Sequence, residues 1–153
     1  MPALIEHTIE IMAGPERVWH VLTHGADYAL QSADTREIVT SAQQEGVGVT
    51  MQLTRPLGPL TLTLHGIFTE WEYARRMSST WRSGFPFWMT TRVLMQLERS
   101  PGGARLYRRY EWSIDWPLLG TWLARRSTPN TTRAMLRLME RIKTAAEIQP
   151  YRS

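Results

Sequence analysis

The last long segment of the chain, residues 131–147, limits most strongly what the protein can fold into. Its apolar side chains recur every three or four residues, which places them in one stripe along a helix. The stripe is formed by Met135, Leu138, Met139, Ile142 and Ala146. Thr128 and Pro129 predict the start of this helix, as an N-cap and a first helical residue. Because nearly everything upstream alternates as strands do, we expect a curved sheet that buries the stripe.

Alternating apolar and polar residues predict strands over most of the remaining chain. These strands span residues 4–12, 35–43, 49–54, 60–71, 76–82, 89–99 and 106–114. A short helix is predicted to begin near Pro15 and to end near Gly25. Residues 116–126 indicate a helical lead-in that Pro129 separates from, or kinks against, the last helix. Gly66 indicates a β-bulge. The short turns between strands imply an antiparallel sheet.

The length of 153 residues suits one domain with a real core, and we expect a single domain over residues 1–153. The chain has no cysteine, which excludes disulfides, thiol catalysis and thiolate metal sites. No apolar run is long enough for a membrane-spanning helix. The first residues lack the apolar segment of a signal peptide. The cytoplasm is therefore the expected compartment.

The charge and the aromatic content point to different conclusions. The net charge is +4, from 18 basic and 14 acidic residues. The arginines are scattered and form no nucleic-acid-binding motif, so we expect solvated faces and no nucleic-acid partner. The seven tryptophans and eight methionines are more informative. They offer the large, adaptable surface that a pocket for a flat apolar ligand needs, and they would serve equally well as core.

The segment from Glu6 to Trp19, EHTIEIMAGPERVW, resembles the opening of the START-like (SRPBCC) superfamily. It is most similar to the polyketide cyclase/dehydrase branch, whose members begin with a strand, an Ala-Pro turn and a helix carrying Val-Trp. Glu70, the Gly46-x-Gly48 turn and the ending with Lys143 and Glu147 also resemble that branch. Where the family commonly has Asp and Trp after the first helix, this chain has His24 and Gln31, although Tyr28 is kept.

The resemblance implies an α+β helix-grip fold of the START/Bet v 1-like type. In that fold a seven-stranded antiparallel sheet wraps around a long C-terminal helix, with an apolar cavity between them. The superfamily includes carriers, cyclases, hydrolases and chaperone activators, so the fold leaves the function open.

The most informative polar residues are Arg108 and Tyr110, which share a strand face with Leu106, Trp112 and Ile114. An arginine on an apolar face needs an anion or a hydrogen-bonding partner, unless it extends to water near the strand end. The first alternative predicts that Arg108 binds an enolate or carboxylate of a ligand, with Tyr110 as the proton donor. The second alternative predicts no site.

Three other residues are candidates for proton transfer. His65 could be a general base, since imidazole is the usual side chain for that role, but strict alternation turns it outward. Tyr28 and Asp34 follow the first helix, over the expected mouth of the cavity, where they would act as gate or acid–base groups or lie on the surface. His20 and His24 have the spacing of metal ligands on a helix, but no third ligand is evident, so we expect no metal.

The resemblance, together with the aromatic and polar residues on one strand face, implies a protein that encloses a hydrophobic, aromatic or polyketide-like molecule and needs no cofactor. Catalysis is left open, and if it occurs we expect cyclisation or dehydration. The residues expected to contact the ligand are Trp81, Trp88, Trp112, Met51, Met95, Met135 and Met139. One alternative is a non-catalytic lipid or quinone carrier, and another is an interaction module with a filled core. A homodimer is also left open.

Overall fold

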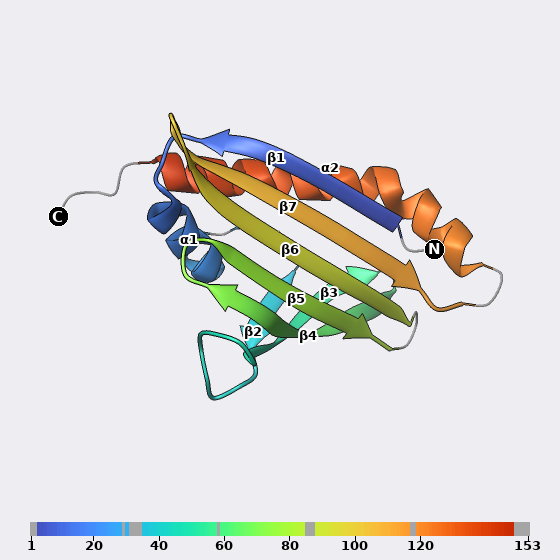
Figure 1. Ribbon diagram of the computed structural model, residues 1–153. Coiled ribbons are helices and arrows are strands. Elements are labelled where there is room, and N and C mark those ends of the chain that lie inside the picture. Colours follow the sequence, from blue (N-terminus) through green and yellow to red (C-terminus); the bar gives the residue numbers. More distant parts are fainter. Residues whose placement is uncertain are drawn as a thin grey trace.

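The computed structural model describes residues 3–28, 30, 35–57, 59–84, 88–116 and 119–148. Seven strands, two α-helices and one short 3-10 helix follow one another along this part of the chain (Figure 1). They are β1 (Ala3–Ile11), α1 (Pro15–Thr23), η1 (Gly25–Tyr28), β2 (Arg36–Val39), β3 (Thr50–Leu57), β4 (Leu60–Glu72), β5 (Arg76–Ser83), β6 (Met89–Ser100), β7 (Gly103–Ile114) and α2 (Gly120–Glu147).

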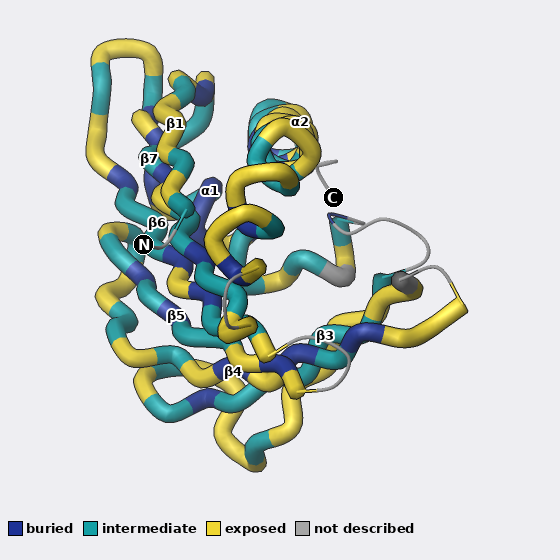
Figure 2. The backbone as a smooth tube through the Cα atoms, turned by 90° about the vertical axis from the view of Figure 1, so that its right-hand side faces the viewer, coloured by how far each residue is buried: buried dark blue, intermediate teal, exposed yellow. Residues whose placement is uncertain are grey.

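All seven strands form one antiparallel sheet in the order β1-β7-β6-β5-β4-β3-β2. The sheet is strongly curved, and α2 lies along its inner side against β1 and β7 (Figure 2). We call the sheet face toward α2 the concave face and the opposite one the convex face. Helix α1 packs against α2 at one end of the molecule. The predicted seven-stranded sheet around a C-terminal helix is therefore confirmed.

The apolar stripe of α2 is buried as predicted. Met135, Met139, Ile142 and Ala146 are buried, and Leu138 is partly buried against the same core. Opposite them the sheet contributes Ile11, Met77, Leu97 and Leu106, and α1 contributes Val18 and Trp19. Each fully buried aliphatic side chain stabilises the fold by about 1.5–3 kcal/mol relative to exposure. This cluster holds the helix at one end of the concave face.

Two details of the chain differ from their predictions. Helix α2 begins at Gly120, so Pro129 lies inside it and does not start it. Proline has no N–H to donate to the carbonyl four residues before it, which belongs to Arg125. The Ser127 and Thr128 hydroxyls donate to the neighbouring carbonyl of Ala124. The second strand is shorter than predicted, since β2 covers only Arg36–Val39.

The predicted bulge at Gly66 is wrong. Gly66 pairs regularly with Met51 on β3 and with Trp81 on β5, and the register shift lies further along β4, between Phe68 and Glu70. The short turns expected between strands include one at Pro101, because β6 ends at Ser100 and β7 starts at Gly103.

Candidate functional site

The strand register brings residues from distant parts of the sequence into rows across the concave face. One row runs from Gly66 through Trp81 and Thr91 to Trp112. The next row contains Phe68, Ser79, Val93 and Tyr110, and a third contains Met77, Met95, Arg108 and His7. Side chains alternate between the two faces of a sheet, so the residues within each row lie side by side. The rows bring together the aromatic and polar residues that the sequence analysis singled out on three strands.

Two tryptophans flank a hydroxyl group in the first row. The indole of Trp81 lies directly over Gly66, where an added Cβ would meet ring atoms at 2.5 Å. Its Nε1 donates a hydrogen bond of 2.9 Å to the Ser79 hydroxyl. Trp112 is buried, and its Nε1 donates to the hydroxyl of Ser127 on α2 at 3.3 Å. Between the two indoles, the Oγ1 of Thr91 is buried and has no hydrogen-bond partner within the described ranges.

Arg108 is a buried cation in the third row. The residue is only 8% exposed, and its guanidinium carbon lies 5.6 Å from the ring centre of Tyr110. Burial lowers the pKa of the Arg108 guanidinium, while attraction from Tyr110 and Glu37 acts in the opposite direction. Its Nε has no hydrogen-bond partner among the described residues. A buried N–H without an acceptor is unfavourable, so the Nε–H of Arg108 is suited to an anionic oxygen brought by a ligand.

Glu37 is an exposed acidic residue whose charge acts on Arg108, and the sequence did not point to it. It lies on β2, and its pairing with Leu53 puts it on the concave face. Strand β2 is separated from β7 by four strands in the sheet, yet the curvature brings Glu37 close enough for its charge to act on Arg108. Alternation within β2 could have assigned the face of Glu37. No pattern in the sequence indicates how strongly the sheet is curved.

The methionines expected to contact a ligand lie in two different places. Met95 neighbours Arg108 in the register and is partly buried, and Met51 is partly buried opposite Gly66. Met135 and Met139 are buried in the cluster between α2 and the sheet.

Tyr110 and Trp112 pack against each other, with ring centres 5.4 Å apart. Tyr110 is partly buried, so both of the polar residues predicted for this strand lie on the concave face. Arg108 is buried, so it does not extend to water as the second alternative expected.

Several predicted site residues are not brought to this group. His65 is exposed on the convex face, paired with Gln52 and Arg82, so alternation removes it from the site. Trp88 is 57% exposed at the start of β6. His7 lies in the Arg108 row but is exposed. Asp34 lies outside the described residues.

Tyr28 lies at the end of the molecule where α1 meets α2. Its hydroxyl is 3.1 Å from Nη1 of Arg17 and 3.0 Å from Nδ1 of His20. Arg17 also donates to the carbonyls of Ala145 and Ile148 at the end of α2. Arg17 thus links α1 to the end of α2, and Tyr28 contacts the side chain that forms this link.

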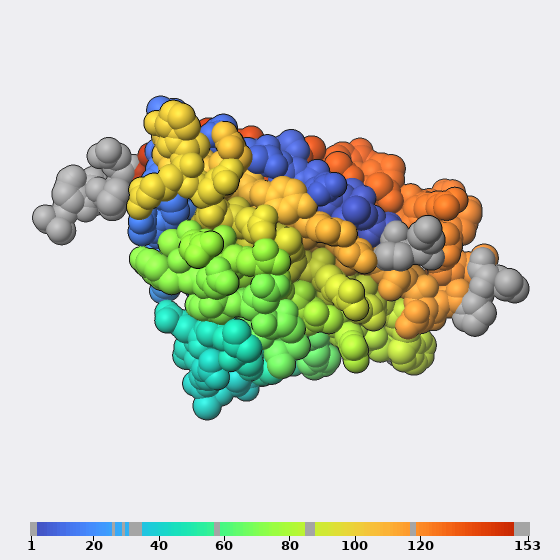
Figure 3. Space-filling model, in the orientation of Figure 1, coloured from blue at the N-terminus to red at the C-terminus, as the bar shows by residue number. Residues whose placement is uncertain are grey.

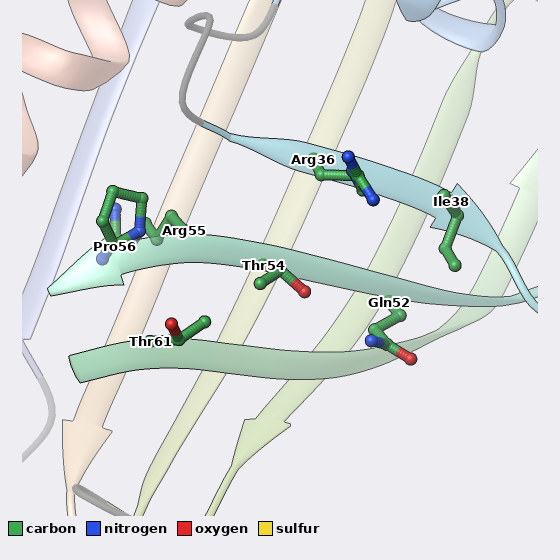
Figure 4. A pocket seen from close by; sticks show the side chains of 7 residues that line it. All are labelled: Arg36, Ile38, Gln52, Thr54, Arg55, Pro56 and Thr61. Atoms are coloured by element: carbon green, nitrogen blue, oxygen red, sulfur yellow. The ribbon is translucent and has the colours of Figure 1, made fainter.

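Two hollows lie on the convex face. One, of about 390 Å³, is formed at the β2–β4 end of the sheet (Figure 4). It is lined by Arg36, Ile38, Gln52, Thr54, Arg55, Pro56 and Thr61. The other, of about 960 Å³, lies where the β4–β5 turn approaches the start of α1, and ion pairs such as Arg76–Glu70 border it. Neither includes Arg108 or Tyr110, so neither belongs to the concave site.

Among the described residues, no three His, Asp or Glu side chains come together as a metal site. No helix within the described ranges has the length and apolar character needed to cross a membrane.

Solved proteins of similar structure share little sequence identity with this chain. No protein-family model and no curated protein sequence matches it. The Zhui aromatase/cyclase from Streptomyces sp. R1128 is similar with a TM-score of 0.75 at 16% identity, over 96% of this chain and 94% of that one. Ara h 8.0201 is similar with a TM-score of 0.73 at 12% identity, over 95% and 98% of the two chains. The protein TTHA0849 from Thermus thermophilus has a TM-score of 0.72 at 13% identity, over 95% and 97%.

At identities this low, the likeness shows a common fold and leaves the activity to be argued from the site. Each similarity extends over nearly the whole of both chains. The chain therefore has the helix-grip fold of the START-like and polyketide cyclase-type proteins.

Proposed function

We propose that the protein binds a flat aromatic or polyketide-like molecule on the concave face and holds an anionic oxygen of that molecule at Arg108. The observation that carries this proposal is the buried guanidinium whose Nε has no partner in the described part of the chain, on a sheet face that also presents two tryptophans. Hydrogen bonds to a charged group contribute about 1.5–3 kcal/mol, which makes such a cation selective for anionic ligands. The indoles supply flat apolar area for the rest of the ligand.

The same residues support a chemical step, cyclisation of a poly-ketone chain with loss of water. Glu37 would remove a proton from the carbon between two carbonyls, and Arg108 would stabilise the enolate oxygen. The enolate carbon then forms a carbon–carbon bond to a ketone of the same chain. The resulting alkoxide takes the proton of the Tyr110 hydroxyl. Tyr110 then regains a proton from Glu37, which holds the proton removed from carbon. Loss of the new hydroxyl with a neighbouring hydrogen, as water, completes the double bond. One of the similar structures is an aromatase/cyclase.

Binding is tested with two fluorescent probes of nearly the same shape. Anilinonaphthalene sulfonate carries a sulfonate that phenylnaphthylamine lacks. We expect Arg108→Met to weaken binding of the sulfonate probe by about tenfold or more, because one charge-assisted contact is lost. The affinity for the neutral probe should change by less than about threefold. The matched control is Arg109→Met, because Arg109 is the exposed neighbour on the convex face, where it pairs with Glu111. Equal losses for both probes would show that Arg108 does not recognise the anion.

Turnover is tested separately from binding, because a non-catalytic carrier would share the same site. A poly-ketone thioester is incubated with the protein and with the Glu37→Gln and Tyr110→Phe variants, and products smaller by one water are followed by mass spectrometry. The cyclase proposal expects turnover that both variants reduce while the sulfonate probe still binds. A carrier would bind the probe, release the thioester unchanged and retain an unmodified ligand in native mass spectrometry of protein from its own host.

A further inference from the structure

One end of the molecule presents four large apolar side chains that are about half exposed. Trp88 is 57% exposed, Trp116 45%, Leu119 45% and Trp122 54%. We call these four residues the tryptophan tip. The fold holds them together, because the Asp115 N–H donates to the Trp88 carbonyl at 2.6 Å and the Gly120 N–H donates to the Trp116 carbonyl at 2.7 Å. The start of β6, the end of β7 and the start of α2 thus meet at one end.

This end lies away from α1 and from the end of α2 (Figure 1). In the space-filling view the first residues of α2, in orange, project at the right-hand side, whereas α1, in blue, lies at the left (Figure 3). The tip is also separate from Arg108 and Tyr110, which lie within β7 on the concave face. The tryptophan tip is therefore a surface distinct from the proposed binding site.

The charges around the tip are mainly positive. Arg125 and Arg126 are exposed on the first turns of α2, and Arg82 is exposed near the end of β5. Asp115 is the exposed acidic residue between them. The guanidinium of Arg126 lies 5.2 Å from the ring centre of Trp122, a cation–π arrangement that keeps its charge beside the indole.

We propose that the tryptophan tip docks on an anionic lipid membrane surface. Indole rings prefer the boundary between lipid tails and headgroups, because one edge is apolar and the N–H is polar. Arginines beside them would bind lipid phosphates, which they contact in a bidentate way. The same surface is too small to form a stable dimer with a second copy of the chain. Three half-exposed indoles and one leucine offer about 400 Å², whereas a stable dimer needs about 800 Å² from each partner.

The proposal goes beyond ligand binding and does not depend on it, because its test uses vesicles without any aromatic ligand. The protein is sedimented with sucrose-loaded vesicles of phosphatidylcholine, with and without phosphatidylglycerol, at low and high salt. We expect binding to the phosphatidylglycerol vesicles that salt weakens. The double variant Trp88→Ser/Trp122→Ser should lower the bound fraction by about fivefold or more. The double variant Arg125→Gln/Arg126→Gln should remove the preference for the anionic lipid.

The control is Tyr73→Ser, a change of an aromatic residue that is 67% exposed in the β4–β5 turn near α1. It should bind vesicles as the wild type does, and all variants should keep the wild-type unfolding midpoint. The proposal is overturned if the wild type ignores anionic vesicles, or if Tyr73→Ser loses as much binding as the tryptophan variant. It is also overturned if sedimentation velocity shows a dimer that the tryptophan variant abolishes while vesicles are not bound.

Discussion

The close approach of Trp81 to Gly66 allows a sharp test of how the concave face is built. In Gly66→Ala, the new Cβ would lie 2.5 Å from Cδ2 and Cε3 of the indole and 2.7 Å from Cε2. Ordinary carbon contacts are about 3.5 Å or longer, so the ring must move by about 1 Å. That movement strains the Nε1 hydrogen bond to Ser79, which is 2.9 Å long. The substitution therefore acts on the indole and not on the strand alone.

The expected magnitude follows from three effects. Forcing an extra methyl group against a packed ring costs about 1–3 kcal/mol. Weakening the bond between Trp81 and Ser79 adds up to about 1 kcal/mol. Replacing glycine within a strand raises the free energy of unfolding by about 0.5–1 kcal/mol, because alanine loses less conformational entropy on folding. Gly66→Ala should thus lower the free energy of unfolding by about 1–3 kcal/mol, and the unfolding midpoint by a few degrees.

Urea denaturation of the wild type, Gly66→Ala, Trp81→Ala and the double variant measures this effect as a double-mutant cycle. In the background of Trp81→Ala the ring is gone, so adding Gly66→Ala should be neutral or stabilising by up to about 1 kcal/mol. Gly84→Ala is the matched control, because an added Cβ there meets nothing within 4 Å. If Gly66→Ala destabilises equally with and without the indole, the clash is not with Trp81 and the reasoning is refuted.

Two further predictions concern charges. Glu37→Gln should strengthen binding of the sulfonate probe in a fluorescence titration, because it removes a negative charge that acts on Arg108. Unchanged affinity would place Glu37 outside the site. Bonds from the Lys143 ammonium and the Met12 N–H lower the pKa of Glu147, so its stabilising effect is present above the carboxyl's unfolded pKa and is lost as the pH falls through the lower folded pKa. Wild type should therefore exceed Glu147→Gln in urea stability at neutral pH, and the difference should disappear in acid; a constant difference would contradict this linkage.

The sequence predicted the fold through its two periodicities. The stripe around Met139 and Ile142 identified the helix, and alternation identified the strands and the shared face of Arg108 and Tyr110. These features depend only on spacing along the chain. The start of α2 was misplaced because Pro129 is typical of a first helical turn, and the hydroxyls that accompany it inside the helix give no distinct pattern.

The remaining part of the site depends on contacts between distant strands. Gly66 was interpreted as a bulge because a glycine in a strand often marks one, whereas here it leaves room for Trp81. Glu37 was missed because its relation to Arg108 arises from the curvature of the whole sheet. Register and curvature are set by pairing and packing across the sheet. The spacing of residues along the chain does not indicate either of them.

The buried Nε–H of Arg108 donates to no acceptor in the described ranges, and we expect it to form a hydrogen bond to an anionic oxygen of the ligand. This hydrogen bond is measured most directly in an NMR correlation spectrum of the arginine Nε–H groups, in which the Arg108→Met spectrum identifies the Arg108 signal. Adding anilinonaphthalene sulfonate should move that proton signal downfield, as a new charge-assisted hydrogen bond requires, and phenylnaphthylamine should move it much less. If the signal stays in place with the sulfonate probe, or moves equally with both probes, the anion is not bound at Arg108.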